Sequence, residues 1–308
     1  MRFSVITPCL NRADLLGATI ESVLAQEYND FEHWIIDGGS TDGTLDVLKR
    51  YADLRIVSEP DRGLYDAINK GIRLATGDVI VILNSDDLLV PGAFTISAEI
   101  FQHTVGTMIV SGGCQIFRNT PEGTEIEMHR YSDPREYALS LRNVTIGKPN
   151  LNARFFRRKV FAEIGEFHLA YPMSADRDFL IRVALRRLPD APVAKVLYRY
   201  RWHAGSLTMN SGNTTLLAAM KENERIAQFY SGFSGLSASD LRNLRTLGKR
   251  SGATALMILA LRGAWGEFCR DLVAKIVSDP SFVFVLSRAG TAAIFRRLRI
   301  WVTLQRNR

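Results

Sequence analysis

The chain has 308 residues, 46% of them hydrophobic and 23% charged, which is an ordinary globular composition and enough length for one large domain or two smaller ones. Its three cysteines lie far apart and form no CxxC pair, which argues against a disulfide framework or a cysteine zinc site and indicates a reducing compartment. The formal net charge is +7, and residues 211–308, with fifteen Lys and Arg against six acids, carry a net +9 and leave −2 for residues 1–210.

The first residues, MRFSVITPCLNR, have no charged region ahead of a long apolar core, so we expect no signal peptide. No uncharged apolar run approaches the ~20 residues that a membrane-spanning helix needs. We therefore expect a cytoplasmic protein that at most lies peripherally on the inner face of the cell membrane.

Short apolar runs alternate with amphipathic segments over the first ninety residues. Strands are expected over residues 3–7, 33–36, 55–57 and 79–83, and helices from Asn11, after a cap at Thr44, and over residues 64–75. Strands that alternate with helices of this length predict a mostly parallel sheet with helices on its faces, which is an α/β fold.

The middle of the chain is less regular. It contains a strand-like run over residues 108–110, a basic and aromatic segment over 155–167, a helix that begins at Asp176 and a strand-like run over 193–201. Beyond His203 the pattern is helical, and we expect a domain boundary near residue 210.

Each of the first four expected strands is followed by a polar loop that contains an acid or an amide. The four loops cover residues 7–11, 37–40, 59–63 and 84–87. Because the carboxyl ends of parallel strands meet at one edge of a sheet, and ligands bind at that edge in open α/β sheets, these loops predict a binding site.

The fourth strand ends in two adjacent carboxylates, Asp86 and Asp87. Two neighbouring carboxylates repel each other unless something positive lies beside them. A divalent cation would serve, and so would a helix N-terminus, in which case Ser85 and the acids merely cap the next helix.

The order of these motifs resembles the family 2 glycosyltransferases, which have the GT-A fold. The resemblance is carried by SVITPCLNR, WIIDGGSTDGT, SEPDRGLYDAINKGIRLATGDVIVILNSDD and SADRDFLIRV, and the segment is most similar to bacterial members that build exopolysaccharide or O-antigen. It implies a Rossmann-like, GT-A catalytic domain over residues 1–210 and leaves residues 211–308 as a basic helical C-terminal extension.

The resemblance implies an inverting transfer of a sugar from a nucleotide-diphosphate donor, with a UDP-sugar expected, to a hydroxyl of a saccharide or lipid-linked acceptor in cell-surface polysaccharide synthesis. Such a reaction needs a cation for the diphosphate and a base for the hydroxyl. By resemblance Asp87 binds Mg²⁺ or Mn²⁺ and Asp86 contacts the donor, while His203 is a candidate third ligand or phosphate donor.

The remaining donor-binding candidates lie in the first three loops and the helix after the third strand. By resemblance the first loop holds the base and ribose, and Asp37 reads the base, although DGGS alone could be a turn. Arg62 could contact phosphate or be solvated, and Asn69 shares a helix face with Asp66 and Arg73. These candidates are Thr7, Pro8, Asn11, Asp37, Asp61, Arg62 and Asn69.

Asp176 is the candidate general base. The family has an acidic pair at the start of this helix, and its second member takes the acceptor's proton. Ala175 replaces the first member here, so only Asp176 matches, with Asp178 as the alternative and favourable N-terminal helix charge as the structural interpretation.

The tail alternates apolar runs with Arg and Lys between Ala253 and Trp301. Basic amphipathic helices can lie on an anionic membrane surface, and the alternatives are packing on the catalytic domain or on a second copy in a homo-oligomer. Nucleic-acid binding fits poorly because the tail lacks an interleaved aromatic platform.

Two other functions stay open at this point. A sugar-nucleotide nucleotidyltransferase also binds a nucleotide at a parallel sheet edge, but it usually has a glycine-rich loop where this chain has TPCLNR. A non-catalytic sugar-nucleotide-binding subunit would not need Asp87 and Asp176, and donor hydrolysis would distinguish it.

Overall fold

The computed structural model describes residues 1–147, 151–203 and 213–285. The chain divides into two compact units, Met1–Ala204 and Gly205–Arg308. The domain boundary expected near residue 210 lies outside the described residues.

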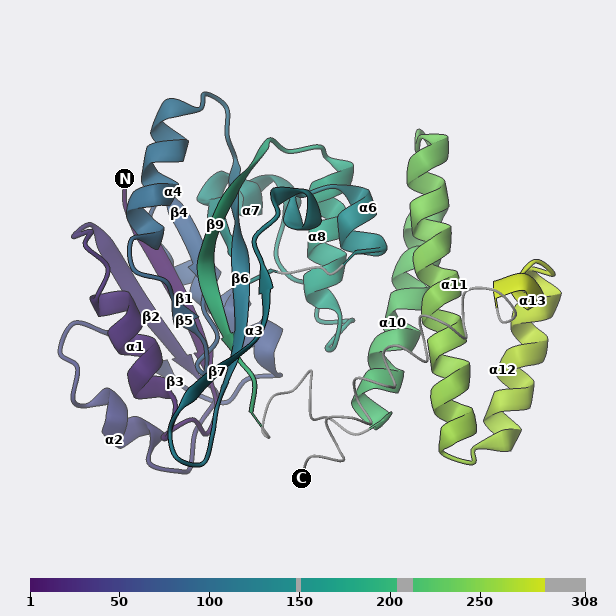
Figure 1. The fold of residues 1–308 in the computed structure, drawn as a ribbon, viewed down its shortest axis with the longest axis horizontal. Helices are drawn as coiled ribbons and strands as arrows, with labels where there is room; N and C mark the ends of the chain where they lie inside the picture. Colours follow the sequence, from purple (N-terminus) through teal and green to yellow (C-terminus); the bar gives the residue numbers. More distant parts are fainter. Residues whose placement is uncertain (148–150, 204–212, 286–308) are drawn as a thin grey trace. The chain divides into compact units, whose positions relative to one another are not determined.

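The first unit is built on a mixed sheet, in agreement with the predicted α/β class (Figure 1). Four parallel strands come first, in the spatial order β3 (Arg55–Ser58), β2 (Phe31–Asp37), β1 (Phe3–Cys9) and β4 (Val79–Ile82). The sheet then continues through β8 (Arg154–Arg157), β6 (Ile109–Asn119), β9 (Asp190–Arg201) and β5 (Leu88–Leu89), and β7 (Glu125–Tyr131) pairs with β6.

Helices cover both faces of the parallel part. On one face α1 (Leu16–Leu24) and α2 (Thr44–Leu48) form a core cluster with Cys9 and Ile35. On the other face α3 (Leu64–Leu74) approaches the sheet at Gly71, where an added Cβ would lie 2.3 Å from Cγ2 of Ile6. Glycine is therefore required at this close contact between helix and sheet.

The remaining helices of this unit lie around the second half of the sheet. They are α4 (Ala93–His103), α5 (Pro134–Tyr137), α6 (Leu141–Thr145), α7 (Arg158–Ile164) and α8 (Ala175–Leu185). Phe94 of α4 stacks on Phe3 with ring centroids 4.7 Å apart, and Phe155 meets Phe3 edge-on. These aromatic contacts join α4, β1 and β8 into one core.

Two predicted helix starts were wrong. The first helix begins at Leu16 instead of Asn11, because residues 11–15 are held in a loop by bonds to the segment after β2. Thr44 is the first residue of α2 and not its cap; its N–H donates to Oδ1 of Asp42 at 2.9 Å.

The second unit consists of helices, as predicted for the tail. They are α10 (Asn213–Ser231), α11 (Ala238–Leu261), α12 (Trp265–Ser278) and α13 (Phe282–Val285). Ala255, Ile258 and Leu259 of α11 pack on Leu217 of α10, with Phe268 of α12 beside them. Within the described ranges, no helix has the length and apolar content to cross a membrane.

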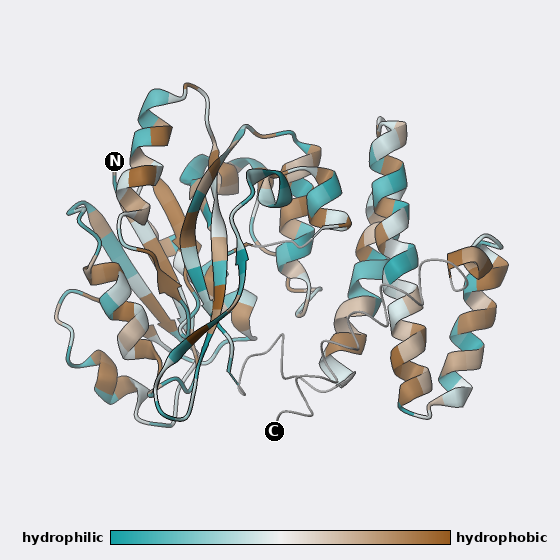
Figure 2. Ribbon diagram, viewed as in Figure 1, coloured by the Kyte–Doolittle hydropathy of each residue, from teal (hydrophilic) through white to brown (hydrophobic). Residues whose placement is uncertain are grey.

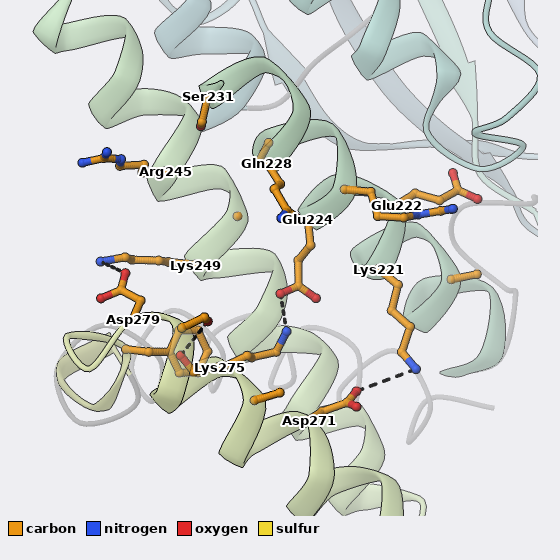
Figure 3. A pocket seen from close by; sticks show the side chains of 17 residues that line it. Lys221, Glu222, Glu224, Gln228, Ser231, Arg245, Lys249, Asp271, Lys275 and Asp279 are labelled. Carbon is orange, nitrogen blue, oxygen red and sulfur yellow. Dashed lines mark hydrogen bonds and ion pairs between the residues drawn. The ribbon is translucent and has the colours of Figure 1, made fainter. Parts of the chain in front are cut away.

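A groove of about 1010 Å³ runs between these helices, and ion pairs bridge it (Figure 3). Lys275 of α12 pairs with Glu224 of α10. Lys249 of α11 lies 2.8 Å from the carboxylate of Asp279. The charges that face the groove are therefore largely compensated within the unit.

Candidate active site

The loops after β1 and β2 are tied together at the carboxyl edge of the parallel strands. Asn11 has a left-handed backbone (φ 52°), and its Oδ1 accepts from the N–H of Thr41 at 2.9 Å. Its own N–H donates to Oγ of Ser40 at 2.7 Å, and Gly38 N–H donates to the Cys9 carbonyl at 2.9 Å. Asn11 itself is exposed, so it lies where a ligand at this edge can contact it.

Asp37 is fully buried and accepts hydrogen bonds from its own loop and from β3. Its Oδ2 accepts from Gly39 N–H at 3.2 Å and from Ser40 N–H at 3.1 Å. Ser58 of β3 donates a third hydrogen bond to this oxygen at 2.7 Å, and the Ser40 hydroxyl donates to Oδ1. This is the turn-forming arrangement of DGGS, and reading of the base by Asp37 stays a prediction.

Thr7 and Pro8 lie inside the sheet, where both are buried in β1. Oγ1 of Thr7 lies 2.8 Å from Nε2 of His33 on the neighbouring strand. Burial lowers the pKa of His33 to about 3, so this imidazole is neutral at physiological pH. Thr7, Pro8 and His33 therefore support the loop after β1 from inside the sheet.

The loop after β3 packs against the loop after β2. Oδ1 of Asp61 accepts from Gly63 N–H at 2.7 Å, and Oδ2 lies so close to Gly38 that a Cβ there would be 2.5 Å away. The Arg62 side chain is 77% exposed and forms an ion pair with Asp66 at 3.1 Å. The hydrogen bond from Arg62 lowers the pKa of Asp66.

Asn69 is buried, and both the nitrogen and the oxygen of its amide make a hydrogen bond inside the protein. Its Nδ2 donates to the carbonyl of Phe167 at 2.9 Å, and its Oδ1 accepts from the N–H of the same residue at 2.9 Å. Asn69 thus fixes the segment between α7 and α8 to α3. The structure gives this donor-binding candidate a structural role in the helix that leads to the site.

An Asn69→Ala substitution is expected to lower the free energy of unfolding by about 1–3 kcal/mol, because two buried backbone groups of Phe167 lose their partner. Denaturant unfolding would measure the loss. The control is Arg73→Ala on the same helix, since this arginine is 52% exposed and makes only a surface ion pair with Glu166. Unchanged stability together with a raised KM for donor would contradict the structural role.

The two adjacent carboxylates after β4 point in different directions. Asp87 is fully buried, and its Oδ2 accepts from the Tyr198 hydroxyl at 2.6 Å and from Asn84 Nδ2 at 3.0 Å. Its Oδ1 accepts from the backbone N–H of Arg201 at 2.8 Å. Burial, and then the charge of Asp86, raise the pKa of Asp87. Asp87 therefore anchors the loop after β4 to β9.

Asp86 is partly exposed and faces the loops of the other strands. Its Oδ2 lies 2.9 Å from Nε2 of His203 and 3.8 Å from Nε of Arg12. Its backbone carbonyl accepts from Nε of Arg201 at 3.0 Å. The structure thus brings His203 together with Asp86 and not with Asp87.

Asp86 and His203 fit a divalent cation that is coordinated partly by the protein and partly by a bound substrate. In the part of the chain that the structure describes, no three His, Cys, Asp or Glu side chains gather into a complete metal site. Mg²⁺ and Mn²⁺ often take one or two protein ligands and complete their coordination with water and phosphate oxygens. The partly exposed carboxylate of Asp86 is the type of ligand that these hard cations prefer, and the imidazole 2.9 Å from it is close enough to be a second ligand.

Asp176 lies in the first turn of α8 and is half-buried. Its Oδ1 accepts from the N–H of Arg177 at 2.7 Å, and it also accepts a hydrogen bond from the side chain of Tyr65. Burial raises its pKa, although the Arg177 charge and these hydrogen bonds oppose the shift. Tyr65 belongs to the first turn of α3, which starts at the carboxyl edge of β3, so Asp176 is placed at the same edge as Asp86.

Asp178 has a different environment. It is fully buried, and its Oδ2 lies 3.0 Å from Nε of Arg182 and 2.9 Å from Nδ1 of His168. Arg182 also donates to the carbonyls of Ile164 and Glu166. Asp178 therefore holds α8 to the end of α7, which leaves Asp176 as the acid that can meet a ligand.

Sequence reasoning missed four residues of the site. Tyr198 and Arg201 belong to a strand that was predicted, but their hydrogen bonds to the loop after β4 connect positions more than 110 residues apart. Arg12 and Tyr65 stand inside motifs that were quoted, and their spacing gives no sign of contact with Asp86 or Asp176.

Comparison with known proteins identifies the family and the fold of the chain. The sequence profile of "Glycosyl transferase family 2" matches residues 4–165. A "PGL/p-HBAD biosynthesis glycosyltransferase" of Mycobacterium bovis is 35% identical over 187 residues, which cover 58% of this chain and 68% of that protein. An uncharacterized glycosyltransferase of Mycobacterium tuberculosis is 33% identical over 189 residues, which cover 59% and 68% of the two chains.

Solved structures share the fold at low sequence identity. A mannosyltransferase from Pyrobaculum calidifontis, solved with GDP-Man and Mn²⁺, has a TM-score of 0.61 and 18% identity, and the match covers 98% of this chain and 83% of that one. Residues 1–349 of TarS from S. aureus, solved with UDP-GlcNAc, give 0.57 and 17%, covering 88% and 89%. The fold is thus that of the GT-A glycosyltransferases, and the chain belongs to glycosyltransferase family 2.

Proposed function

We propose that this enzyme transfers a sugar, with inversion, from a UDP-sugar to a hydroxyl of a saccharide or lipid-linked acceptor. The observation that carries the proposal is the placement of two separate accessible carboxylates at one sheet edge. Asp86 is paired with His203, and Asp176 is paired with Tyr65. One can serve the leaving diphosphate and the other the attacking hydroxyl.

Asp176 takes the proton of the acceptor hydroxyl in this proposal. A carboxylate with a raised pKa is a better proton acceptor than an ordinary Asp, and burial supplies the shift here. Tyr65 donates to Asp176 and fixes the direction of its carboxylate. Tyr65 is thus a positioning residue.

Asp86 and His203 hold Mg²⁺ or Mn²⁺ in this proposal. When bound, the cation supplies positive charge for the departing diphosphate. Arg12, whose Nε lies 3.8 Å from Asp86, adds a second positive group at the same place. Asp87, the ligand first expected from the family resemblance, instead positions the loop by its three hydrogen bonds.

Inversion is proposed because a direct displacement needs only a base, whereas retention by double displacement needs a nucleophile. Cys9, which ends β1 at this edge, is unsuited to that role. Burial, and then the charge of Asp37, raise the pKa of its thiol to about 12, so it is protonated at physiological pH.

The donor-binding surface is proposed to consist of the exposed parts of the first three loops, with Asn11, Asp61 and Arg62 in contact with the donor. Thr7, Pro8, Asp37 and Asn69 give these loops their shape from inside. The role in cell-surface glycan or glycolipid synthesis, and the position at the cytoplasmic face, are part of the same proposal. The name of the mycobacterial relative supports the glycan or glycolipid role.

Thermal unfolding with UDP-, GDP- and dTDP-sugars, each with and without Mn²⁺, tests the proposal. A UDP-sugar with Mn²⁺ is expected to raise Tm the most, since a ligand at a hundred times its Kd stabilises the folded state by about 2.7 kcal/mol. Slow release of UDP from the donor should accompany binding in an enzyme and be absent from a non-catalytic subunit. Equal shifts with and without Mn²⁺ would count against the cation.

A further inference from the structure

The helix α12 carries an exposed apolar stripe along one side. Trp265, Val273 and Val277 are 60%, 60% and 76% exposed, and with Cys269 they recur every four residues, which places them on one helix face. Leu261, the last residue of α11, and Phe284 of α13 are also exposed, at 59% and 70%. Figure 2 shows the apolar colour along α12 and α13. We call the five residues Leu261, Trp265, Val273, Val277 and Phe284 the α12 stripe.

The α12 stripe is not the side by which the helix packs in its unit. Phe268 and Leu272 make the core contacts, and Trp265 meets the edge of the Phe268 ring with centroids 5.7 Å apart. Val273 and Val277 are turned further from this packed side of the helix. The acids of α12 also lie away from the stripe, where Glu267 and Asp271 are 3.7 and 3.8 Å from Lys221 of α10. The exposed apolar residues therefore have no acidic neighbour on their own face of the helix.

Positive charge borders the α12 stripe instead. Arg262 and Arg270 are exposed, and neither has an ion-pair partner among the residues that the structure describes. The sequence that follows, residues 286–308, adds six arginines and no acid. Exposed valines and a tryptophan on one helix face, in a basic segment of the chain, are typical of helices that lie in a membrane interface.

We propose that the α12 stripe docks on an anionic lipid bilayer. Its apolar side chains enter the boundary between headgroups and acyl chains, and Arg262 and Arg270 lie at the negative headgroups. Two other partners could cover the stripe: a second copy of the chain, or residues 286–308. Charge argues against both. A second copy packed on the stripe by a two-fold axis would bring like charges together, and residues 286–308 would add six arginines beside two uncompensated ones.

The test is co-sedimentation of the full chain with vesicles of phosphatidylcholine alone or with added phosphatidylglycerol. We expect binding to the anionic vesicles only, weakened by salt, and on the order of tenfold weaker for the double variant Val273→Asp/Val277→Asp. The matched control is Val105→Asp, since Val105 is 99% exposed in the first unit and lies outside the stripe. Arg262→Glu/Arg270→Glu should also weaken binding without removing apolar surface.

Wild-type binding by the double variant would overturn the proposal, and so would the absence of any binding by the wild type. Light scattering and Tm show whether a second copy or residues 286–308 cover the stripe instead. A dimer lost in the double variant assigns the stripe to a second copy, and a lower Tm with unchanged vesicle binding assigns it to residues 286–308. If the double variant does not fold, quenching of tryptophan fluorescence by vesicles of brominated lipid is measured instead. Stronger quenching in the wild type than in Trp265→Phe supports docking, and equal quenching in the two proteins contradicts it. Vesicle binding needs no donor, so its failure leaves the proposed transfer untouched.

Discussion

An Asp176→Asn enzyme is expected to bind donor like the wild type and to lose transfer by a factor on the order of 10² or more. The amide keeps the size of the side chain and can still accept from Tyr65 and from the N–H of Arg177, so the helix start should persist. It cannot take a proton from the acceptor. Donor affinity from calorimetry and turnover from product release would separate the two effects.

The control for this substitution is Asp178→Asn, two residues along the same helix. Its carboxylate is buried between Arg182 and His168, so its loss should lower Tm while the folded fraction keeps its turnover. Normal turnover by Asp176→Asn, or a larger loss in Asp178→Asn at equal folded fraction, would exclude Asp176 as the base.

The pH dependence of kcat/KM tests the role of Asp176 in a second way. A general base works in its ionised form, so the rate falls as pH drops through its pKa. Because burial raises the pKa of Asp176 above its ordinary 3.8, the acid limb of kcat/KM should lie above that pH. Tyr65→Phe removes a hydrogen bond that favours the ionised form, so it should move the limb to still higher pH. A merely structural role for Tyr65 would lower Tm and leave the limb in place.

The parallel core could be predicted from sequence because its signals are local. The runs over residues 33–36 and 79–83 are short, apolar and rich in β-branched residues, and such runs form buried strands with little dependence on distant contacts. The chain order of strands and helices then fixes where the carboxyl ends meet. The edge that carries the candidate site followed from these two facts.

The directions of individual side chains could not be predicted in the same way. Asp86 and Asp87 are adjacent and chemically alike. Asp87 turns inward because it accepts hydrogen bonds from Tyr198 and from the backbone of Arg201, which lie on a strand far along the chain. Asn69 faces Phe167 across 98 residues for the same kind of reason. The hairpin of β6 and β7 was also missed, since β7 has no buried face: six of its seven residues are exposed, Ile126 and Met128 among them.

Asp86→Asn is expected to reduce transfer by a factor on the order of 10³ and to abolish the Mn²⁺-dependent part of the thermal shift by UDP-sugar. An amide is a poorer ligand for hard cations than a carboxylate, and it leaves His203 without its charged partner. His203→Ala should have a smaller effect, because water can replace one neutral ligand. Turnover, and Mn²⁺ binding followed by electron spin resonance in the presence of UDP, would measure both substitutions.

Asp87→Asn is the matched control, because it changes the neighbouring carboxylate in the same way. Its carboxylate is fully buried and hydrogen-bonded to Tyr198 and to the backbone of Arg201, so we expect a stability loss of about 1–3 kcal/mol with Mn²⁺ affinity retained by the folded enzyme. The opposite pattern, in which Asp87→Asn loses Mn²⁺ and Asp86→Asn keeps it, would return the metal to Asp87. That result would require Asp87 to leave Tyr198 and turn outward when the donor binds, and a crystal structure with donor and Mn²⁺ would show such a rotation directly.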